Sequence, residues 1–158
     1  MSVIVGIDPG VSGAVVWMND HGRHMGLVCD MPTIEIRGKR IVDGAGLAEQ
    51  LQRFGISMVV LEHVQGVQQS GATSAFSFGR GFGIIEGVIA GLKLPSTLVR
   101  PQVWTRAMSV GSDKGAHRDA ARRRWPECAE LFARVRDDGR ADAALLCEWW
   151  RTHRASAE

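Results

Sequence analysis

The sequence predicts an α/β fold in which a mixed five-stranded sheet is flanked by helices. Residues 2–17 read SVIVGIDPGVSGAVVW, two apolar segments around a Pro-Gly turn, which is typical of an antiparallel β-hairpin. Another apolar segment, at 56–64, follows an amphipathic helix. This strand–helix–strand order implies a right-handed crossover that places the later strand parallel to the first. We therefore expect one sheet with both antiparallel and parallel pairs.

The first half of the chain supplies four of the expected strands and one helix. The strands are expected at 3–8, 13–18, 23–32 and 56–64. Leu47, Leu51 and Phe54 recur at helical spacing before a glycine, which predicts an amphipathic helix over 44–55. The polar stretch EIRGKRIVDG, at 35–44, is expected to form an exposed loop. The fourth strand lacks alternation of polar and apolar residues, which indicates burial on both faces.

The second half begins with a long helix, expected over 70–95, that is rich in glycine. Its glycines recur every fourth residue on one face, at Gly79, Gly83, Gly87 and Gly91. Glycine inside a helix costs roughly 0.5–1 kcal/mol relative to alanine, so this glycine stripe indicates that another backbone approaches closely. The helix can pack on the sheet of its own domain or against a second copy of the chain, and the sequence leaves both open.

The remaining elements are one strand and three helices. The fifth strand is expected at 96–101, and helices are expected at 102–108, 114–126 and 139–153. The helix at 114–126 is basic and is ended by Pro126. The last helix places Ala141, Leu145 and Trp149 on one side, as an amphipathic helix that covers a core does.

Acidic residues end the two strands that we expect to run parallel. Asp8 ends the first strand and Glu62 ends the fourth, so both carboxylates should lie at the same edge of the sheet. Adjacent buried carboxylates repel each other unless a cation lies between them, and divalent metal ions take oxygen ligands. Asp-Pro-Gly is also ordinary turn chemistry. Asp142, in the first turn of the last helix, is either a third ligand, which the convergence favours, or a helix-start charge.

Basic residues are concentrated in the second half of the chain. Residues 1–92 carry six Lys/Arg and eight Asp/Glu, whereas residues 93–158 carry thirteen and nine. The segment 100–124 holds two acidic residues and seven basic ones: Arg100, Arg106, Lys114, Arg118, Arg122, Arg123 and Arg124. Such a run is either a solvated helix face or a surface that binds nucleic acid.

Length and composition exclude several classes of protein. A chain of 158 residues with 45% hydrophobic residues is expected to form a single domain over 1–158. The longest apolar stretch is interrupted by Glu86 and Lys93, so no membrane-spanning helix and no membrane partner is expected. The N-terminus lacks a signal-peptide pattern. Three cysteines without a CxxC pair predict reduced thiols of a cytoplasmic protein, with neither disulfides nor a zinc site.

Six short segments of the chain, in order, resemble the RuvC family of Holliday junction resolvases, which have an RNase H-like fold. They are GIDPG (6–10), LEHV (61–64), SAFSFGRGFGIIEGVIAGLKLP (74–95), VRPQVW (99–104), GSDKGA (111–116) and RADAALL (140–146). Kinase-like ATPases also open with a segment like GIDPG, but they need a much longer, two-lobed chain. The short length and the segment DGRADAALL are most similar to the bacteriophage or prophage branch of the family.

The resemblance implies a homodimeric endonuclease that cuts four-way and other branched DNA by paired symmetric nicks. Its implied cofactor is Mg²⁺, replaceable by Mn²⁺, with two ions in each active site. Asp8, Glu62 and Asp142 match the metal-binding carboxylates, and Lys114 matches the lysine of the catalytic centre. The expected DNA contacts are Arg80, Arg100, Lys114, Arg118, Arg122, Arg123 and Arg124. The expected dimer interface includes Gly79, Gly83 and Gly87.

One departure from the family pattern concerns the fourth metal ligand, whose usual position falls on Gly139. Asp138 is the expected substitute, because it lies four residues before Asp142 and side chains at that spacing share a helix face. Asp137 is the reserve. Asp138 has an alternative duty as the N-cap of the last helix.

Other departures affect the residues that distort DNA in the family. A wedge aromatic position falls on Gln65, and a second lysine position falls on Trp104, which is otherwise expected in the core. His117, on the basic helix, either contacts phosphate or is solvated. Two alternative functions stay open: an RNase H-like nuclease for structured RNA, such as a ribosomal RNA precursor, and a catalytically inactive junction-binding protein.

Overall fold

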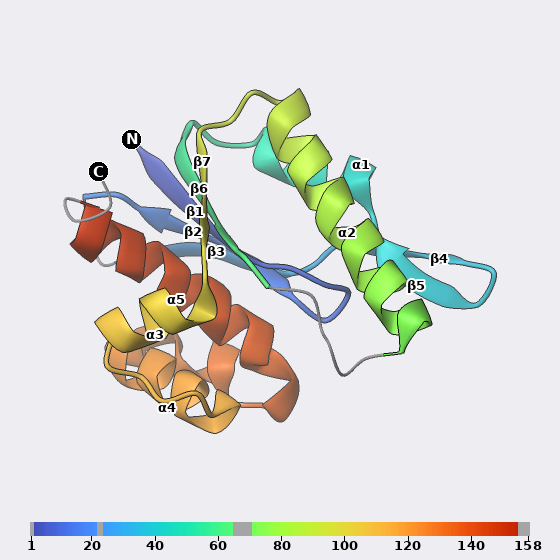
Figure 1. The fold of residues 1–158 in the computed structure, drawn as a ribbon. Helices are drawn as coiled ribbons and strands as arrows, with labels where there is room; N and C mark the ends of the chain where they lie inside the picture. Colours follow the sequence, from blue (N-terminus) through green and yellow to red (C-terminus); the bar gives the residue numbers. More distant parts are fainter. Residues whose placement is uncertain (1, 22–23, 65–70, 155–158) are drawn as a thin grey trace.

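The structure is a computed structural model that describes residues 2–21, 24–64 and 71–154 (Figure 1). Gln65 lies outside the described residues. The main sheet has five strands in the order β3-β2-β1-β6-β7. These strands are β1 (Val3–Asp8), β2 (Ala14–Asn19), β3 (Met25–Asp30), β6 (Ile56–Glu62) and β7 (Ser96–Val99). The mixed five-stranded sheet predicted from the sequence is confirmed.

The pairing of β1 brings two acidic strand ends together. β1 pairs antiparallel with β2, with Asp8 opposite Ala14. On its other side it pairs parallel with β6, with Ile7 opposite Leu61. The next residues along these two strands are Asp8 and Glu62, so both carboxylates lie at one edge of the sheet, as the strand–helix–strand order predicts.

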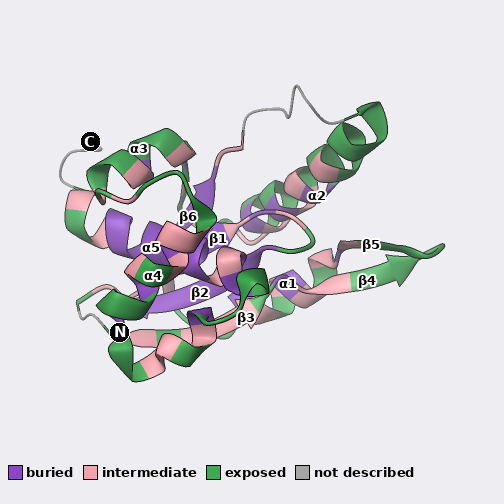
Figure 2. Ribbon diagram, turned by 90° about the horizontal axis from the view of Figure 1, so that it is seen from below, coloured by how far each residue is buried: buried purple, intermediate pink, exposed green. Residues whose placement is uncertain are grey.

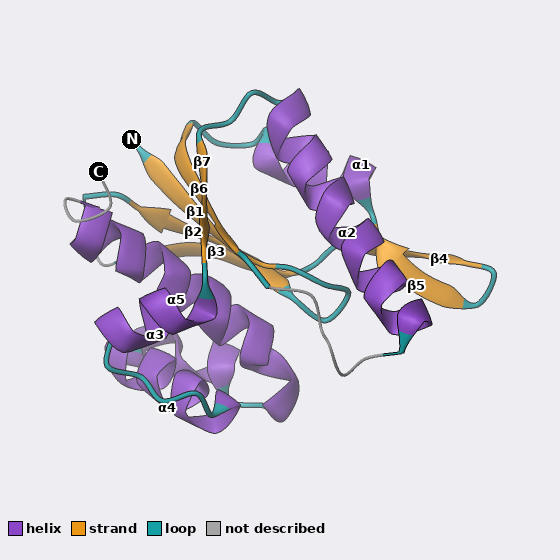
Figure 3. Ribbon diagram, viewed as in Figure 1, coloured by secondary structure: helices purple, strands orange, loops and turns teal. Residues whose placement is uncertain are grey.

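Helices cover both faces of the sheet (Figures 1 and 3). They are α1 (Gly44–Leu51), α2 (Ala72–Gly91), α3 (Pro101–Ala107), α4 (Lys114–Arg124) and α5 (Asp138–His153), with 3₁₀ turns η1 (Pro126–Phe132) and η2 (Val135–Asp137). One core cluster lies between the sheet and α5, where Val16, Val60 and Leu145 are buried together. A second cluster lies under α1 and α2, where Ile7, Leu47 and Ile85 are buried.

A second, two-stranded sheet occupies the stretch that the sequence predicts to be a loop. β4 (Thr33–Ile36) and β5 (Lys39–Val42) form a hairpin in which Ile36 lies opposite Lys39. Arg37 and Gly38 form its two-residue turn, with φ of 51° and 73°, and positive φ at both positions is typical of a type I′ turn. The prediction of a loop is wrong because two short β-branched segments flank this turn.

The glycine stripe of α2 points away from the sheet. The buried residues of α2 are Gly81, Ile85 and Ile89. Gly79, Gly83, Gly87 and Gly91 are exposed, and a Cβ on any of them would have nothing within 4 Å. Packing of the stripe on the sheet of its own domain is therefore wrong. Figure 2 shows the buried residues gathered in β1, β2 and α5, while the first turns of α2 and the β4–β5 hairpin are mostly exposed.

Two expectations from composition can be compared with the described residues. Among them, no helix is both long and apolar enough to cross a membrane. Cys29, Cys128 and Cys147 are all free, and Cys147 is buried.

Candidate active site

Three carboxylates from different elements meet at the edge of the sheet. Asp8 ends β1, Glu62 ends β6 and Asp142 lies in the first turns of α5; each offers an oxygen within 4.8 Å of the others. Glu62 and Asp142 are buried and Asp8 is partly exposed. The cluster expected from the sequence is thus assembled, and Asp8 is the least buried of its three residues.

A close contact between α5 and β1 brings Asp142 to the strand ends. A Cβ on Gly6 would lie only 2.0 Å from the carbonyl oxygen of Ala143, so the helix backbone rests directly on the strand. Only glycine allows this approach. Gly6, the first glycine of the GIDPG segment, therefore allows the first turns of α5 to reach the edge of the sheet where Asp8 and Glu62 lie.

The same close packing accounts for the glycine at the family's fourth ligand position. A Cβ on Gly139 would lie 2.8 Å from Asp8 Oδ2 and 2.9 Å from the Cα of Gly13, in the β1–β2 turn. Position 139 therefore faces the cluster, as the resemblance implies. It has no room for a side chain unless the backbone of the turn moves.

Neither neighbouring aspartate joins the cluster as placed. Asp138 pairs with the guanidinium of Arg118 on α4. Asp137 is buried, accepts a hydrogen bond of 2.8 Å from the backbone N–H of Arg134, and pairs with the Arg134 guanidinium at 2.8 Å. Asp138 is the first residue of α5 and not its N-cap, so the capping alternative is wrong. To bind a metal ion, Asp138 would have to leave Arg118.

The electrostatics of the cluster favour a bound cation. Burial, together with the charges of Asp142 and Glu62, holds the pKa of Asp8 well above its usual value. Burial also raises the pKa of Glu62, against a hydrogen bond from Trp104 that lowers it. Carboxylates that resist ionisation are stabilised in the charged form by a nearby positive charge. All three donors are oxygen atoms, so the group fits a hard divalent ion such as Mg²⁺ or Mn²⁺.

Trp104 is a site residue that sequence reasoning missed. It is fully buried, which confirms the expectation of a core position, but its indole Nε1–H also donates a 2.9 Å hydrogen bond to Glu62 Oε1. Its ring lies 5.1 Å from that of His117. The indole therefore orients the carboxylate of Glu62 and packs against His117, whose ring contacts the carboxylate of Asp142.

His117 is the second missed residue, and both expectations for it are wrong. It is buried, with Nδ1 at 2.7 Å from Asp142 Oδ1 and Nε2 at 2.6 Å from the carbonyl oxygen of Gly111. Both ring nitrogens thus face oxygen atoms, an arrangement in which the protonated imidazole donates at both positions. Burial works to lower the pKa of His117, but the hydrogen bonds to Asp142 and Gly111 outweigh it, so the pKa is raised.

Lys114 lies where the resemblance implies. Its ammonium group pairs with Oδ2 of Asp142, and about half of the side chain is exposed. Burial works to lower the pKa of Lys114, but attraction to Asp142 and to the other two carboxylates raises it. Lys114 and His117 are three residues apart on α4, so they share a face; this spacing is the signal that could have assigned His117 to the site.

The predicted DNA-contact residues differ in how far they are already engaged. Arg80, Arg100, Arg122 and Arg123 are exposed. Arg118 is mostly buried against Asp138. Arg124 donates hydrogen bonds of 2.5 and 2.9 Å to the buried carboxylate of Glu148, which Arg151 also contacts. The guanidinium of Arg124 therefore neutralises an internal charge, and the DNA contact expected of it stays a prediction.

Comparison with known proteins identifies structures with a similar fold but no related sequence. No protein-family model and no curated protein sequence matches the chain. Among solved structures, Thermus thermophilus RuvC in complex with a Holliday junction substrate matches with a TM-score of 0.66 and 14% identity, covering 95% of this chain and 94% of that one. A structure of RuvC from Thermus thermophilus matches with a TM-score of 0.59 and 17% identity, covering 94% of each chain. The chain therefore has the RNase H-like fold of RuvC over nearly its whole length.

Proposed function

We propose that the chain is a metal-dependent endonuclease that cuts four-way DNA junctions, and other branched DNA, by paired symmetric nicks. The observation that carries the proposal is the convergence of Asp8, Glu62 and Asp142 within 4.8 Å at the sheet edge of a RuvC-like fold. Two Mg²⁺ ions held by these carboxylates would supply an activated water and stabilise the leaving 3′-oxygen.

The residues around the carboxylates have distinct tasks in this proposal. Asp8, the least buried of the three, would hold the ions together with Glu62 and Asp142. Trp104 and His117 hold Glu62 and Asp142 in fixed orientations through hydrogen bonds of 2.9 and 2.7 Å. Lys114, half exposed beside Asp142, is placed to neutralise charge that develops on the scissile phosphate.

Phosphate contacts outside the active site fall to exposed arginines. Arg122 and Arg123 lie on the solvent side of α4, and Arg100 is the N-cap residue of α3. Contacts of this kind position the DNA without reading its sequence, and they release counterions on binding. Affinity for the junction should therefore fall steeply as salt is raised.

A cleavage assay with Asp8→Asn tests the proposed chemistry. With Mg²⁺, the wild-type protein should cut a four-way junction in preference to a fork or a linear duplex. Asp8→Asn should abolish cleavage and leave junction affinity within a few-fold, because the partner of Asp8 is metal and not DNA. Asp119→Asn, which changes an exposed carboxylate of α4, is the matched control.

Three results would contradict the proposal. Full cleavage by Asp8→Asn would overturn the assignment of Asp8, Glu62 and Asp142 as a metal site. Preferential cleavage of a structured RNA would favour the nuclease for ribosomal RNA precursors. Tight junction binding without cleavage, with either Mg²⁺ or Mn²⁺, would favour a catalytically inactive junction-binding protein.

The exposed glycine stripe supports the homodimer that paired nicks require. Gly79, Gly83 and Gly87 form a face of α2 on which a second helix can rest backbone to backbone, crossing nearest Gly83 and Gly87, about two helical turns beyond Phe76. Gly83→Leu has open space in a single chain, so it should fold and should weaken the dimer. Light scattering measures the mass, with Gly55→Leu, another exposed glycine with open space, as control. A wild-type monomer at micromolar concentration would refute the dimer.

A further inference from the structure

A groove of about 970 Å³ lies between the β4–β5 hairpin and the N-terminal half of α2. Its lining extends to Gly10 and Val11, in the β1–β2 turn. Gly10 is two residues beyond Asp8, and consecutive Cα atoms are about 3.8 Å apart, so the lining of the groove begins within about 8 Å of the Asp8 Cα. None of the proposed catalytic residues lines it.

The groove and the basic helix lie on opposite sides of the active-site edge. Figure 1 shows the hairpin and the start of α2 on one side of the sheet and α4 on the other. The guanidinium of Arg40 donates to the carbonyl oxygen of Val11, which ties the hairpin to the turn that follows Asp8. A strand that crosses the active site toward the hairpin therefore meets this groove.

The polar residues of the groove suit an anionic chain. Its lining contains four basic side chains and no carboxylate: Arg37, Lys39, Arg40 and Arg80. Among the residues that the structure describes, Arg37, Lys39 and Arg80 form no ion pair, so their charges are not neutralised internally. The hydroxyl side chains of Thr73, Ser74 and Ser77 line the α2 side and can donate to phosphate oxygens.

The turn of the hairpin presents a basic side chain. Arg37 has a φ of 51°, in the left-handed region that the first position of a type I′ turn requires and that asparagine or glycine adopts more readily. Here the turn places an arginine at the tip of the hairpin, beside Lys39.

The apolar part of the groove distinguishes an unpaired strand from a duplex. Phe76 is 74% exposed and Ile36 is 44% exposed, and Phe78 also lines the groove. A duplex presents its phosphates and hides the faces of its bases, so it would leave these side chains in water. An unpaired strand offers phosphates to the basic residues and base faces to aromatic rings, the combination that single-strand-binding proteins use.

We propose that this groove binds an unpaired segment of the DNA strand that leaves the active site. The inference rests on the proposed function, because a branched substrate supplies unpaired nucleotides close to the cutting site. In the groove, Arg37 and Lys39 contact phosphates, and Phe76 stacks on a base.

Binding of a labelled oligo-dT, a linear duplex and a four-way junction tests the groove, with EDTA present to prevent cutting. The Arg37→Ala/Lys39→Ala double variant should weaken oligo-dT binding at least tenfold. It should also reduce the slope of log K against log salt by about 1.4, since each lost phosphate contact on a single strand removes about 0.7. Phe76→Ala should weaken oligo-dT binding about tenfold with the slope unchanged, because stacking releases no counterions. Both should bind the linear duplex within about twofold of wild type.

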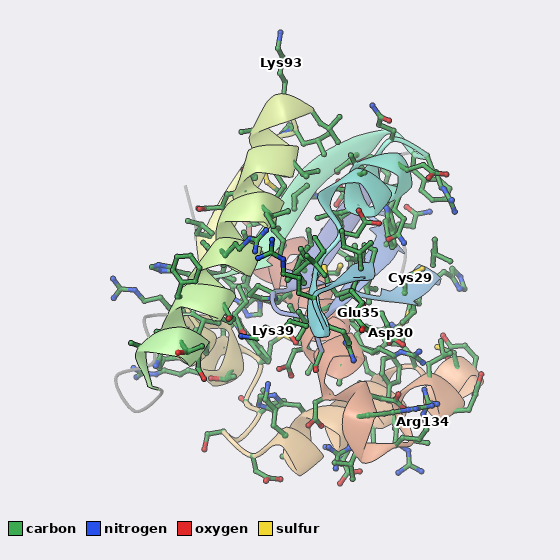
Figure 4. All side chains as sticks on the ribbon, turned by 90° about the vertical axis from the view of Figure 1, so that its right-hand side faces the viewer. Cys29, Asp30, Glu35, Lys39, Lys93 and Arg134 are labelled. Atoms are coloured by element: carbon green, nitrogen blue, oxygen red, sulfur yellow. The ribbon has the colours of Figure 1, made fainter. Side chains whose placement is uncertain are left out.

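The matched control is Arg53→Ala/Lys93→Ala, which removes two exposed charges outside the groove lining. Figure 4 shows Lys93 at the far end of α2, well away from Lys39. This control should bind every DNA like the wild type. All the substituted residues are exposed, so melting temperatures close to wild type are expected and verify folding.

The outcomes separate this inference from the proposed function. If the wild-type protein binds and cuts junctions but the groove variants bind oligo-dT normally, only the proposal that the groove binds an unpaired strand is overturned. A groove that binds a protein partner would give this result. Equal losses on oligo-dT and duplex also overturn it, because the surface then holds paired DNA. A wild-type protein that binds no junction overturns both.

Discussion

The two faces of the sheet share the same strands but have opposite kinds of interior. Between the sheet and the helices α3, α4 and α5, charged or titratable groups are buried: Glu62, His117, Asp137, Asp142 and Glu148. Under α1 and α2, the buried cluster consists of apolar side chains. The charged groups that we assign to binding on the α2 side are exposed.

The difference follows from the cost of burying charge. An unpaired buried charge is strongly unfavourable, so each buried group on the α5 side has a partner: Asp142 has Lys114 and His117, and Glu148 has Arg124 and Arg151. Such networks hold side chains in one geometry, which chemistry needs. The α2 side keeps its charges and glycines exposed, which recognition and assembly need. In the functions proposed above, the α5 side carries catalysis and phosphate contacts through Arg100, Arg122 and Arg123, while the α2 side carries contacts to an unpaired strand and to a second copy.

The strongest test of this division is Trp104→Phe. The substitution keeps an aromatic ring in the core but removes the N–H that orients Glu62. Loss of a partner that orients a metal ligand typically costs about 10–100-fold in metal affinity or activity. We expect the Mg²⁺ concentration for half-maximal cleavage to rise about tenfold or more, while junction affinity in EDTA is unchanged. Metal titrations of the cleavage rate measure the first quantity and fluorescence anisotropy the second.

Trp150→Phe, which changes a half-buried tryptophan near the end of α5, is the control for this test. An unchanged Mg²⁺ requirement in Trp104→Phe would show that Glu62 is held by other contacts. A loss of junction affinity without a change in Mg²⁺ requirement would break the division between the two faces.

The pair Asp137→Asn and Asp138→Asn tests the fourth ligand. Asp137→Asn weakens the buried ion pair with Arg134 and should lower stability by about 1–3 kcal/mol, with the cleavage rate per folded molecule unchanged. If Asp138 stays with Arg118 during catalysis, Asp138→Asn should change cleavage little. If it turns to the metal, as the resemblance implies, the rate should fall by orders of magnitude. Thermal melting and cleavage rates on the same samples separate the two roles, and a catalytic loss in Asp137→Asn alone would overturn both assignments.

The smallest expected effect concerns Asp8 and pH. Because the folded pKa of Asp8 is raised, its contribution to stability is full below the unfolded pKa and is lost as pH rises through the folded pKa. At neutral pH without metal, Asp8→Asn should therefore melt higher than wild type, by about 2–4 °C for each kcal/mol removed. The difference in melting temperature between Asp8→Asn and wild type should shrink as pH falls through the raised pKa of Asp8.

Differential scanning fluorimetry in EDTA between pH 4 and 8 measures this effect. Added Mg²⁺ should raise the melting temperature of the wild type more than that of Asp8→Asn. Equal melting of the two proteins at neutral pH in EDTA would show that Lys114 and His117 already neutralise the cluster.

The local pattern of apolar and polar residues predicted most of the fold. It failed where a side chain's partner lies far away in the sequence. Apolar segments predict β1, β2 and β6, and helical spacing that ends at Gly55 predicts α1. These predictions succeed because burial of a periodic face depends on neighbours in sequence. The β4–β5 hairpin was missed, because its strands are short and largely exposed and so carry little hydrophobic signal. For Asp138, helical spacing places its side chain on the face of Asp142, but Arg118 on another helix draws the carboxylate away.

The sequence by itself determined that β1 pairs with β2 and runs parallel to β6, and hence that Asp8 and Glu62 meet, because handed crossovers leave a strand–helix–strand unit one compact arrangement. Only the tertiary structure decided which groups complete the site. Trp104 and His117, which sequence reasoning did not assign to the site, reach the carboxylates from α3 and α4, and their hydrogen bonds depend on how these helices pack. The tertiary structure also decided that the glycine stripe faces outward, because Ile85 and Ile89 compete for the core and bury more apolar surface than glycine can.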